Sequence, residues 1–231
     1  SALYQTEDFS GAVLEASAAL RVREGEPDGW TLLGQALQMN GQSKEAILAF
    51  RKALQLNPHL HDARNALGYL LVESGQGSEG LREFARVLEE DPRNRTALVN
   101  EGFALLHLGR PAEAEKRFRL VVEKEPESAD ALYNLGLSLK LQDRIDEAAL
   151  SLQAAVERNP RIAEAHYVLG IVHWQRGDLQ RAAESLRRAV EVDPDYGQAY
   201  YMLGTVLLQN DARSEALAVL KRAITLRPED P

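Results

Sequence analysis

The sequence has no cysteine, no long hydrophobic run and no excess of basic residues. Without cysteine the chain can form no disulfide bond, thiol nucleophile or thiolate metal site. Its apolar runs, such as residues 67–72, are too short to cross a bilayer, and no signal-peptide pattern opens the chain. We therefore expect no direct membrane insertion and, by default, a cytoplasmic protein. The formal net charge of −8 has the wrong sign for binding nucleic acid.

What the sequence does contain is a repeat with a period of 34 residues. Six of its nine prolines follow this spacing: Pro58, Pro92, Pro126, Pro160, Pro194 and Pro228. A fixed period of this size is typical of a repeat array. The frame divides the chain into a partial block and six full ones: 1–26, 27–60, 61–94, 95–128, 129–162, 163–196 and 197–231. The partial block is expected to contain mainly a second helix, at about residues 9–22, and all blocks are expected to form one continuous solenoid domain.

Each full block is predicted to be a pair of helices. Apolar residues recur at helical spacing in both halves of a block, so the predicted fold class is all-α. Position 15 is always a residue type that accepts a left-handed backbone: Gly41, Gly75, Gly109, Asp143, Gly177 and Asp211. Position 8 is always glycine, and position 24 is phenylalanine or leucine. We expect this small and large pair to let the two helices approach closely.

The first full block carries most of a known motif, at Trp30, Leu33, Gly34, Ala46, Phe50, Ala53 and Pro58. This pattern resembles the tetratricopeptide repeat family, and the resemblance covers essentially the whole chain. It implies a right-handed superhelical solenoid of antiparallel helix pairs. It also implies that the first helix of each pair lines a concave groove.

No catalytic constellation is found, and we predict a protein that is not an enzyme and needs no cofactor. The chain has neither a glycine-rich phosphate loop nor a nucleophile elbow. His166 and His173 are seven residues apart, a spacing compatible with a metal site, but both occupy packing positions. We interpret them as core histidines with satisfied nitrogens, and His59 and His61 as a solvated pair in a loop.

The resemblance places candidate partner-binding residues at groove positions of the first helices. They are Asn65, Tyr69, Asn100, Phe103, Tyr133, Asn134, Tyr167, Trp174 and Tyr201. Three of them, at position 5, form a ladder of tyrosines in the C-terminal half. An alternative for position 9, including Phe103, is packing between neighbouring helices.

The groove is predicted to bind a protein or peptide segment, either extended or helical. Position 2 is often acidic, and no lysine or arginine occupies position 5, 6 or 9. A partner that is neutral or basic is therefore favoured over a C-terminal carboxylate.

Two other functions remain open on the sequence alone. The second helix of the last block carries Leu217, Leu220 and Ile224, which match apolar residues covered by the next repeat in an internal block. An exposed apolar surface there could stack with further repeats or with copies of the chain, as an end-docking surface. The third possibility is the regulatory arm of a larger enzyme.

Overall fold

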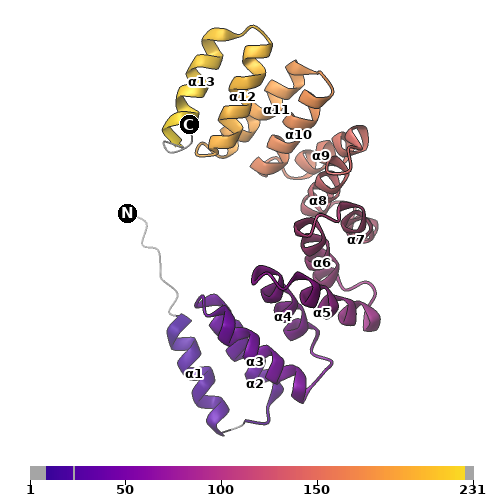
Figure 1. The fold of residues 1–231 in the computed structure, drawn as a ribbon, viewed down its shortest axis with the longest axis vertical. Coiled ribbons are helices and arrows are strands. Elements are labelled where there is room, and N and C mark those ends of the chain that lie inside the picture. Colours follow the sequence, from indigo (N-terminus) through magenta and orange to yellow (C-terminus); the bar gives the residue numbers. More distant parts are fainter. Residues whose placement is uncertain (1–8, 23, 227–231) are drawn as a thin grey trace. The chain divides into compact units, whose positions relative to one another are not determined.

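A computed structural model of the chain describes residues 9–22 and 24–226, and this part forms thirteen α-helices and no β-strand (Figure 1). The helices are α1 (Phe9–Val22), α2 (Pro27–Met39), α3 (Ser43–Leu56), α4 (His61–Glu73), α5 (Gly77–Glu90), α6 (Arg95–His107), α7 (Pro111–Lys124), α8 (Ala129–Lys140), α9 (Ile145–Arg158), α10 (Ala163–Gln175), α11 (Leu179–Val192), α12 (Gly197–Gln209) and α13 (Arg213–Leu226).

The helices follow the 34-residue frame closely. Every first helix starts at the first residue of its block, and the partial block contains α1 where a second helix was predicted. The second helices of the first five full blocks end two residues before a repeat proline, which cannot continue a helix. Pro228 lies outside the described residues. The prediction of helix pairs is confirmed.

The chain divides into two compact units, Ser1–Leu108 and Gly109–Pro231, with the division between the two helices of the third full block. In the first unit, α2 packs on α3 and α4 packs on α5, while α1, α3 and α5 each also pack on the first helix that follows. In the second unit the pairs are α8 with α9, α10 with α11 and α12 with α13, and α7 packs on α8. Whether all blocks form one continuous domain stays a prediction.

The close approach of the paired helices depends on the glycine at position 8. A Cβ atom added to Gly68 would lie 2.6 Å from Cε1 of Phe84, whose side chain is fully buried. In the fifth full block, a Cβ atom on Gly170 would lie 2.6 Å from Cγ of Leu186. A larger residue at position 8 would push the helices apart, so the predicted pairing of small and large residues is confirmed.

The turn between the helices of a block uses a left-handed residue in every full block. The glycines at position 15 have φ between 69° and 79°, and Asp143 and Asp211 have φ of 60° and 57°. Aspartate tolerates this conformation better than most residues because its short polar side chain can bond locally. The sequence prediction for position 15 is confirmed at all six sites.

Candidate protein-binding surfaces

In the first unit, three of the predicted groove residues line one hollow. Tyr69, Asn100 and Phe103 surround a space of about 260 Å³ between α4 and α6, and the ring of Phe84 contributes to its wall. Tyr69 and Phe103 are exposed even though both occupy position 9. The alternative that Phe103 serves only as packing does not fit this exposure. The hollow can accept an apolar side chain, with the Asn100 amide available for a hydrogen bond.

In the second unit, tyrosines gather beside a carboxylate. The ring of Tyr167 (on α10) packs against Tyr196 with centroids 5.1 Å apart and the planes tilted by 48°. Burial raises the pKa of the Tyr133 hydroxyl, and the negative charge of Glu164 raises it further. Burial also raises the pKa of Tyr196, assisted by Tyr167 and Glu164. These hydroxyls remain protonated at neutral pH, so each can donate a hydrogen bond.

Tyr196 was not among the residues selected from the sequence. It is the last residue of its block, immediately before α12, where other blocks have Leu60, Asn94, Ser128 or Ile162. The signal in the sequence that could have identified Tyr196 is an aromatic residue at the last position of a block that also has a tyrosine, Tyr167, at position 5. The Tyr196 side chain extends the tyrosine ladder from the first helices to the loop that precedes α12.

Two further candidates, Trp174 and Tyr201, differ in their exposure to solvent. Trp174 is half-buried, and its Nε1–H donates to Oε1 of Gln209 at 2.7 Å, which joins α10 to α12. Tyr201 is 65% exposed on α12. Of the tyrosine ladder, Tyr201 is therefore the residue whose ring can be removed with the least loss of internal packing.

Asn65 and Asn134 are buried, and neither is accessible to a partner in this structure. The Asn65 amide donates to Oδ1 of Asn94 at 3.4 Å, and the Asn134 amide donates to the Asp130 carbonyl at 2.8 Å. In both asparagines the Oδ1 atom is buried without a hydrogen-bond partner. We leave these two residues out of the binding surface that we propose below.

The histidines fit their predicted roles only in part. His166 is buried, and its Nε2 lies 3.0 Å from the Pro160 carbonyl, as expected of a core histidine. His173 is also buried, but its Nδ1 has no hydrogen-bond partner, so the prediction of satisfied nitrogens is wrong there. Burial lowers the pKa of both imidazoles, which keeps them neutral at pH 7. His59 is exposed and His61 half-buried, as predicted for a solvated pair, and both also contact Oε2 of Glu90, at 2.9 and 3.1 Å.

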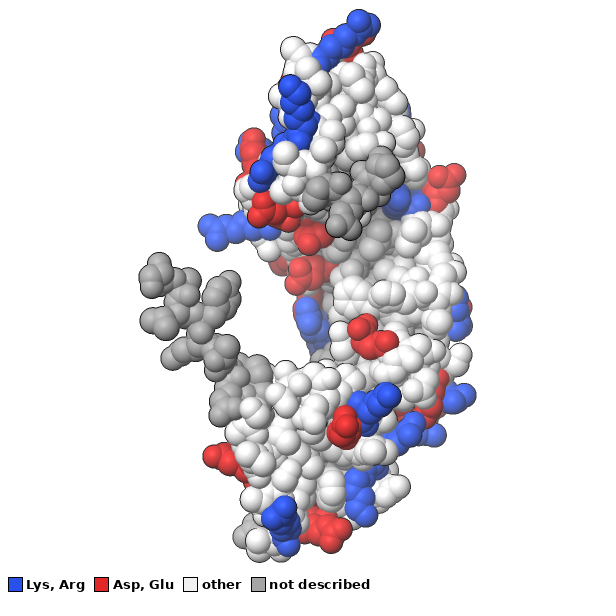
Figure 2. Space-filling model, turned by 60° about the vertical axis from the view of Figure 1, so that its left-hand side comes forward, with Lys and Arg blue, Asp and Glu red and all other residues white. Residues whose placement is uncertain are grey.

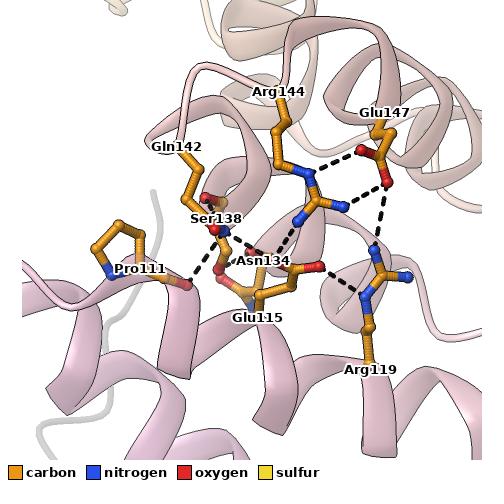
Figure 3. A network of polar contacts seen from close by, with 8 residues as sticks. All are labelled: Pro111, Glu115, Arg119, Asn134, Ser138, Gln142, Arg144 and Glu147. Carbon is orange, nitrogen blue, oxygen red and sulfur yellow. Dashed lines mark hydrogen bonds and ion pairs between the residues drawn. The ribbon is translucent and has the colours of Figure 1, made fainter.

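A polar network that the sequence did not reveal lies between α7, α8 and α9 (Figure 3). The buried carboxylate of Glu115 accepts hydrogen bonds from Arg119 at 2.7 Å, Gln142 at 2.8 Å and Arg144 at 2.6 Å. Arg144 also forms a bidentate pair with Glu147. Burial alone would raise the pKa of Glu115, but its three donors outweigh burial and hold the pKa below the ordinary value.

The charges on the surface are mixed in sign. On the face drawn in Figure 2, acidic and basic side chains are interspersed, with wide uncharged areas between them.

Helix α13 contributes two exposed apolar side chains of the predicted end-docking surface, Leu217 and Ile224, while Leu220 is half-buried. None of the described helices is both long and apolar enough to span a membrane. Within the same residues, no group of three or more histidines and carboxylates could hold a metal ion.

Stacked helix hairpins of 34 residues, with aromatic side chains accessible on their first helices, define the class of helical-repeat scaffolds that mediate protein–protein interactions. Family models of the tetratricopeptide repeat match residues 7–161, 139–195 and 167–231. The chain belongs to the tetratricopeptide repeat family, whose members are typically interaction modules rather than enzymes. No curated protein matches the sequence.

Solved structures of the same family resemble the chain. A crystal structure of MamA is 27% identical, with a TM-score of 0.65, and the match covers 71% of this chain and 95% of MamA. YrrB, described as a TPR protein with an unusual peptide-binding site, is 22% identical with a TM-score of 0.65, over 80% of this chain and 95% of YrrB. PilF of Pseudomonas aeruginosa is 20% identical with a TM-score of 0.77, and the match covers 90% of this chain and 94% of PilF. The predicted fold class is confirmed.

Proposed function

We propose that the protein binds a segment of a partner protein along its first helices, and that this segment is neutral or basic. The observation that carries the proposal is the group of tyrosines beside Glu164 in the second unit. Tyr133, Tyr167 and Tyr196 provide aromatic surface and hydroxyl donors, and Tyr201 adds an exposed ring. A second contact area is available in the first unit, where Tyr69 and Phe103 line a hollow.

The chemistry of this surface favours a cationic side chain over an anionic one. Tyrosine rings attract lysine and arginine through their negative faces, and a nearby carboxylate adds a direct charge interaction. Glu164 is exposed, and its charge acts on the Tyr133 and Tyr196 hydroxyls. An aspartate or glutamate of a partner would be repelled by the same carboxylate. YrrB, which has the same fold, is described as having a peptide-binding site, and this supports a peptide-like ligand.

Selection from a random dodecapeptide display library against the immobilised protein tests this proposal. Among the selected peptides whose binding is weakened by Tyr201→Ala, we expect enrichment in lysine, arginine and aromatic residues and depletion of aspartate and glutamate. Tyr201→Ala should lower the affinity for the selected peptides tenfold or more, which corresponds to about 1.4 kcal/mol or above of binding free energy, because exposed aromatic residues are frequent hot spots. Fluorescence anisotropy with a labelled peptide measures the change, and thermal melting should be nearly unaffected.

The matched control is Leu48→Ala on α3, because Leu48 is also 65% exposed but belongs to a second helix. This variant should keep the wild-type affinity. The proposal would be contradicted if the peptides that depend on Tyr201 were acidic, or if Tyr201→Ala left the affinity of every selected peptide unchanged.

Self-association is the second function that a specific observation favours. Leu217 and Ile224 expose apolar side chains on α13, and such a pair can dock on another copy of the chain or on a further repeat. If so, static light scattering should show a mass that rises with protein concentration, and Leu217→Glu with Ile224→Glu should return it to the monomer value. A mass independent of concentration in the wild type would argue against it. A regulatory role in a larger enzyme stays a prediction.

A further inference from the structure

The network around Glu115 has a counterpart one repeat later, and the counterpart lacks the carboxylate. The residues that stand 34 positions after Glu115, Arg119, Gln142, Arg144 and Glu147 are Ala149, Gln153, Arg176, Asp178 and Arg181. They belong to α9, the end of α10 and the start of α11, as the first set belongs to α7, α8 and α9. Alanine thus stands where the first site has its buried glutamate, which is the only charged residue at position 21 of the six blocks.

A hollow lies at this counterpart site, with Ala149 in its wall. It measures about 440 Å³ and is lined by Ala149, Leu150, Gln153, His173, Arg176, Arg181, Glu184 and Ser185. Two arginines and one glutamate lie in this lining, and each arginine also has an aspartate partner outside it, Asp146 for Arg176 and Asp178 for Arg181. Burial lowers the pKa of His173, which keeps the ring neutral at pH 7.

The same junction also departs from three others. In those, the second helices of neighbouring blocks are joined by an arginine at position 25 and a glutamate at position 19: Arg51–Glu79 at 2.8 Å, Arg119–Glu147 at 3.5 Å and Arg187–Glu215 at 2.9 Å. Two further junctions have Ser17 and Ala85 at position 25 but keep the glutamate at position 19. At the hollow these positions hold Gln153 and Arg181. Position 19 therefore has reversed its charge, and Arg181 cannot form the usual pair.

The polar groups around the hollow are incompletely satisfied. Nδ1 of His173 is buried without a hydrogen-bond partner. Arg181 contacts Asp178 at 3.5 Å, and Arg176 contacts Asp146 at 3.3 Å, both longer than the 2.6–2.8 Å contacts that Glu115 receives. Both arginines thus have donors left for a stronger acceptor.

We propose that this hollow binds a carboxylate supplied from outside the chain, the side chain of an aspartate or glutamate in a protein partner. The incoming carboxylate would lie beside His173, at the place that Glu115 occupies one repeat earlier, and accept hydrogen bonds from Arg176 and Arg181. Leu150, 74% exposed beside the hollow, would contact the apolar part of the partner. This site is formed by α9, the C-terminal end of α10 and α11, and it is independent of the tyrosine surface proposed above.

The first test is a titration with sodium acetate at pH 7, with sodium chloride as the control salt, followed by ¹⁵N NMR of the His173 ring and the arginine Nε groups. We expect saturable shifts at His173, Arg176 and Arg181 that chloride does not reproduce. Ala149→Glu should remove this response, because it places a carboxylate in the hollow from within the chain. It should also melt about 2–4 °C higher than Ala149→Gln, which fills the same space without the charge.

Two more variants keep the result interpretable if Ala149→Glu does not fold. Arg181→Gln changes a side chain that is 66% exposed, and it should weaken the acetate response several-fold without loss of structure. Glu115→Ala should create a second acetate response, at Arg144 and Gln142. An acetate response in Glu115→Ala but none at His173 in the wild type would overturn the proposal. Identical shifts with chloride, or a response that survives Ala149→Glu, would do so as well.

A third arm tests the source of the carboxylate. A pentapeptide with blocked ends and one central glutamate should bind at least tenfold more tightly than acetate, because it can also contact Leu150. The same peptide with glutamine should not shift the His173 resonances. Equal binding of the glutamate and glutamine peptides, or no advantage of the glutamate peptide over acetate, would overturn the assignment to a protein side chain.

Discussion

Replacing Phe84 by alanine should lower the free energy of unfolding by about 3–5 kcal/mol. The Phe84 ring is fully buried and fills the space opposite Gly68, where α4 and α5 approach each other. Alanine would remove the apolar contacts and leave a cavity at the centre of this helix pair, next to the hollow lined by Tyr69 and Phe103. Urea unfolding followed by circular dichroism measures the loss.

Leu48→Ala is the control for this experiment, because the side chain is mostly exposed and should change stability by less than about 0.5 kcal/mol. A loss below about 1 kcal/mol for Phe84→Ala would mean that the pair can collapse around the missing ring. It would contradict the view that the residues at positions 8 and 24 fix the distance between the helices.

Glu115→Gln should cost about 3 kcal/mol at pH 7, because it removes the charge from a buried carboxylate that serves three donors. Arg119 and Arg144 would keep Glu147 as a partner, but the glutamine side chain has a single acceptor oxygen, and its NH2 group can only donate. Glu147→Gln is the control. The Glu147 side chain is 51% exposed, and its loss should cost less than about 1 kcal/mol.

The effect of Glu115→Gln should depend on pH in a defined direction. The pKa of Glu115 in the folded chain lies below the ordinary value of 4.5, so the folded state favours the ionised carboxylate. Its contribution to stability is complete above the unfolded pKa and is lost as pH falls through the lower folded pKa. The difference between the wild type and Glu115→Gln should therefore be constant from pH 7 to pH 5 and shrink below about 4.5. A difference that does not change with pH would show that the charge of Glu115 is unimportant.

The helix pairs could be predicted from the sequence because their determinants are local and repeat. Prolines mark the ends of second helices, and Gly or Asp at position 15 marks each turn with positive φ. Glycine at position 8 and a large residue at position 24 predicted the close packing of each pair. Six copies in one register made each of these signals stronger than it would be in a single block.

The binding surface was predicted less completely, because accessibility depends on side-chain length and on neighbours from other blocks. Asn65 and Tyr133 both occupy position 5, yet the short asparagine is buried and bonds to Asn94, whereas the tyrosine is half-buried. Tyr196 lies in a loop, outside the helix positions that the resemblance selects. The Glu115 network joins residues separated by up to 32 positions, so no local pattern indicates it.

The two tryptophans are distributed one to each compact unit, and this gives the chain a natural optical label for each of them. Trp30 is held through its Nε1–H, which donates to the Glu24 carbonyl at 2.8 Å, and Trp174 is held by Gln209. Indole emission responds to such surroundings, so replacing one tryptophan by phenylalanine leaves a signal from one unit alone. The order in which the units lose their structure can then be followed without an attached dye.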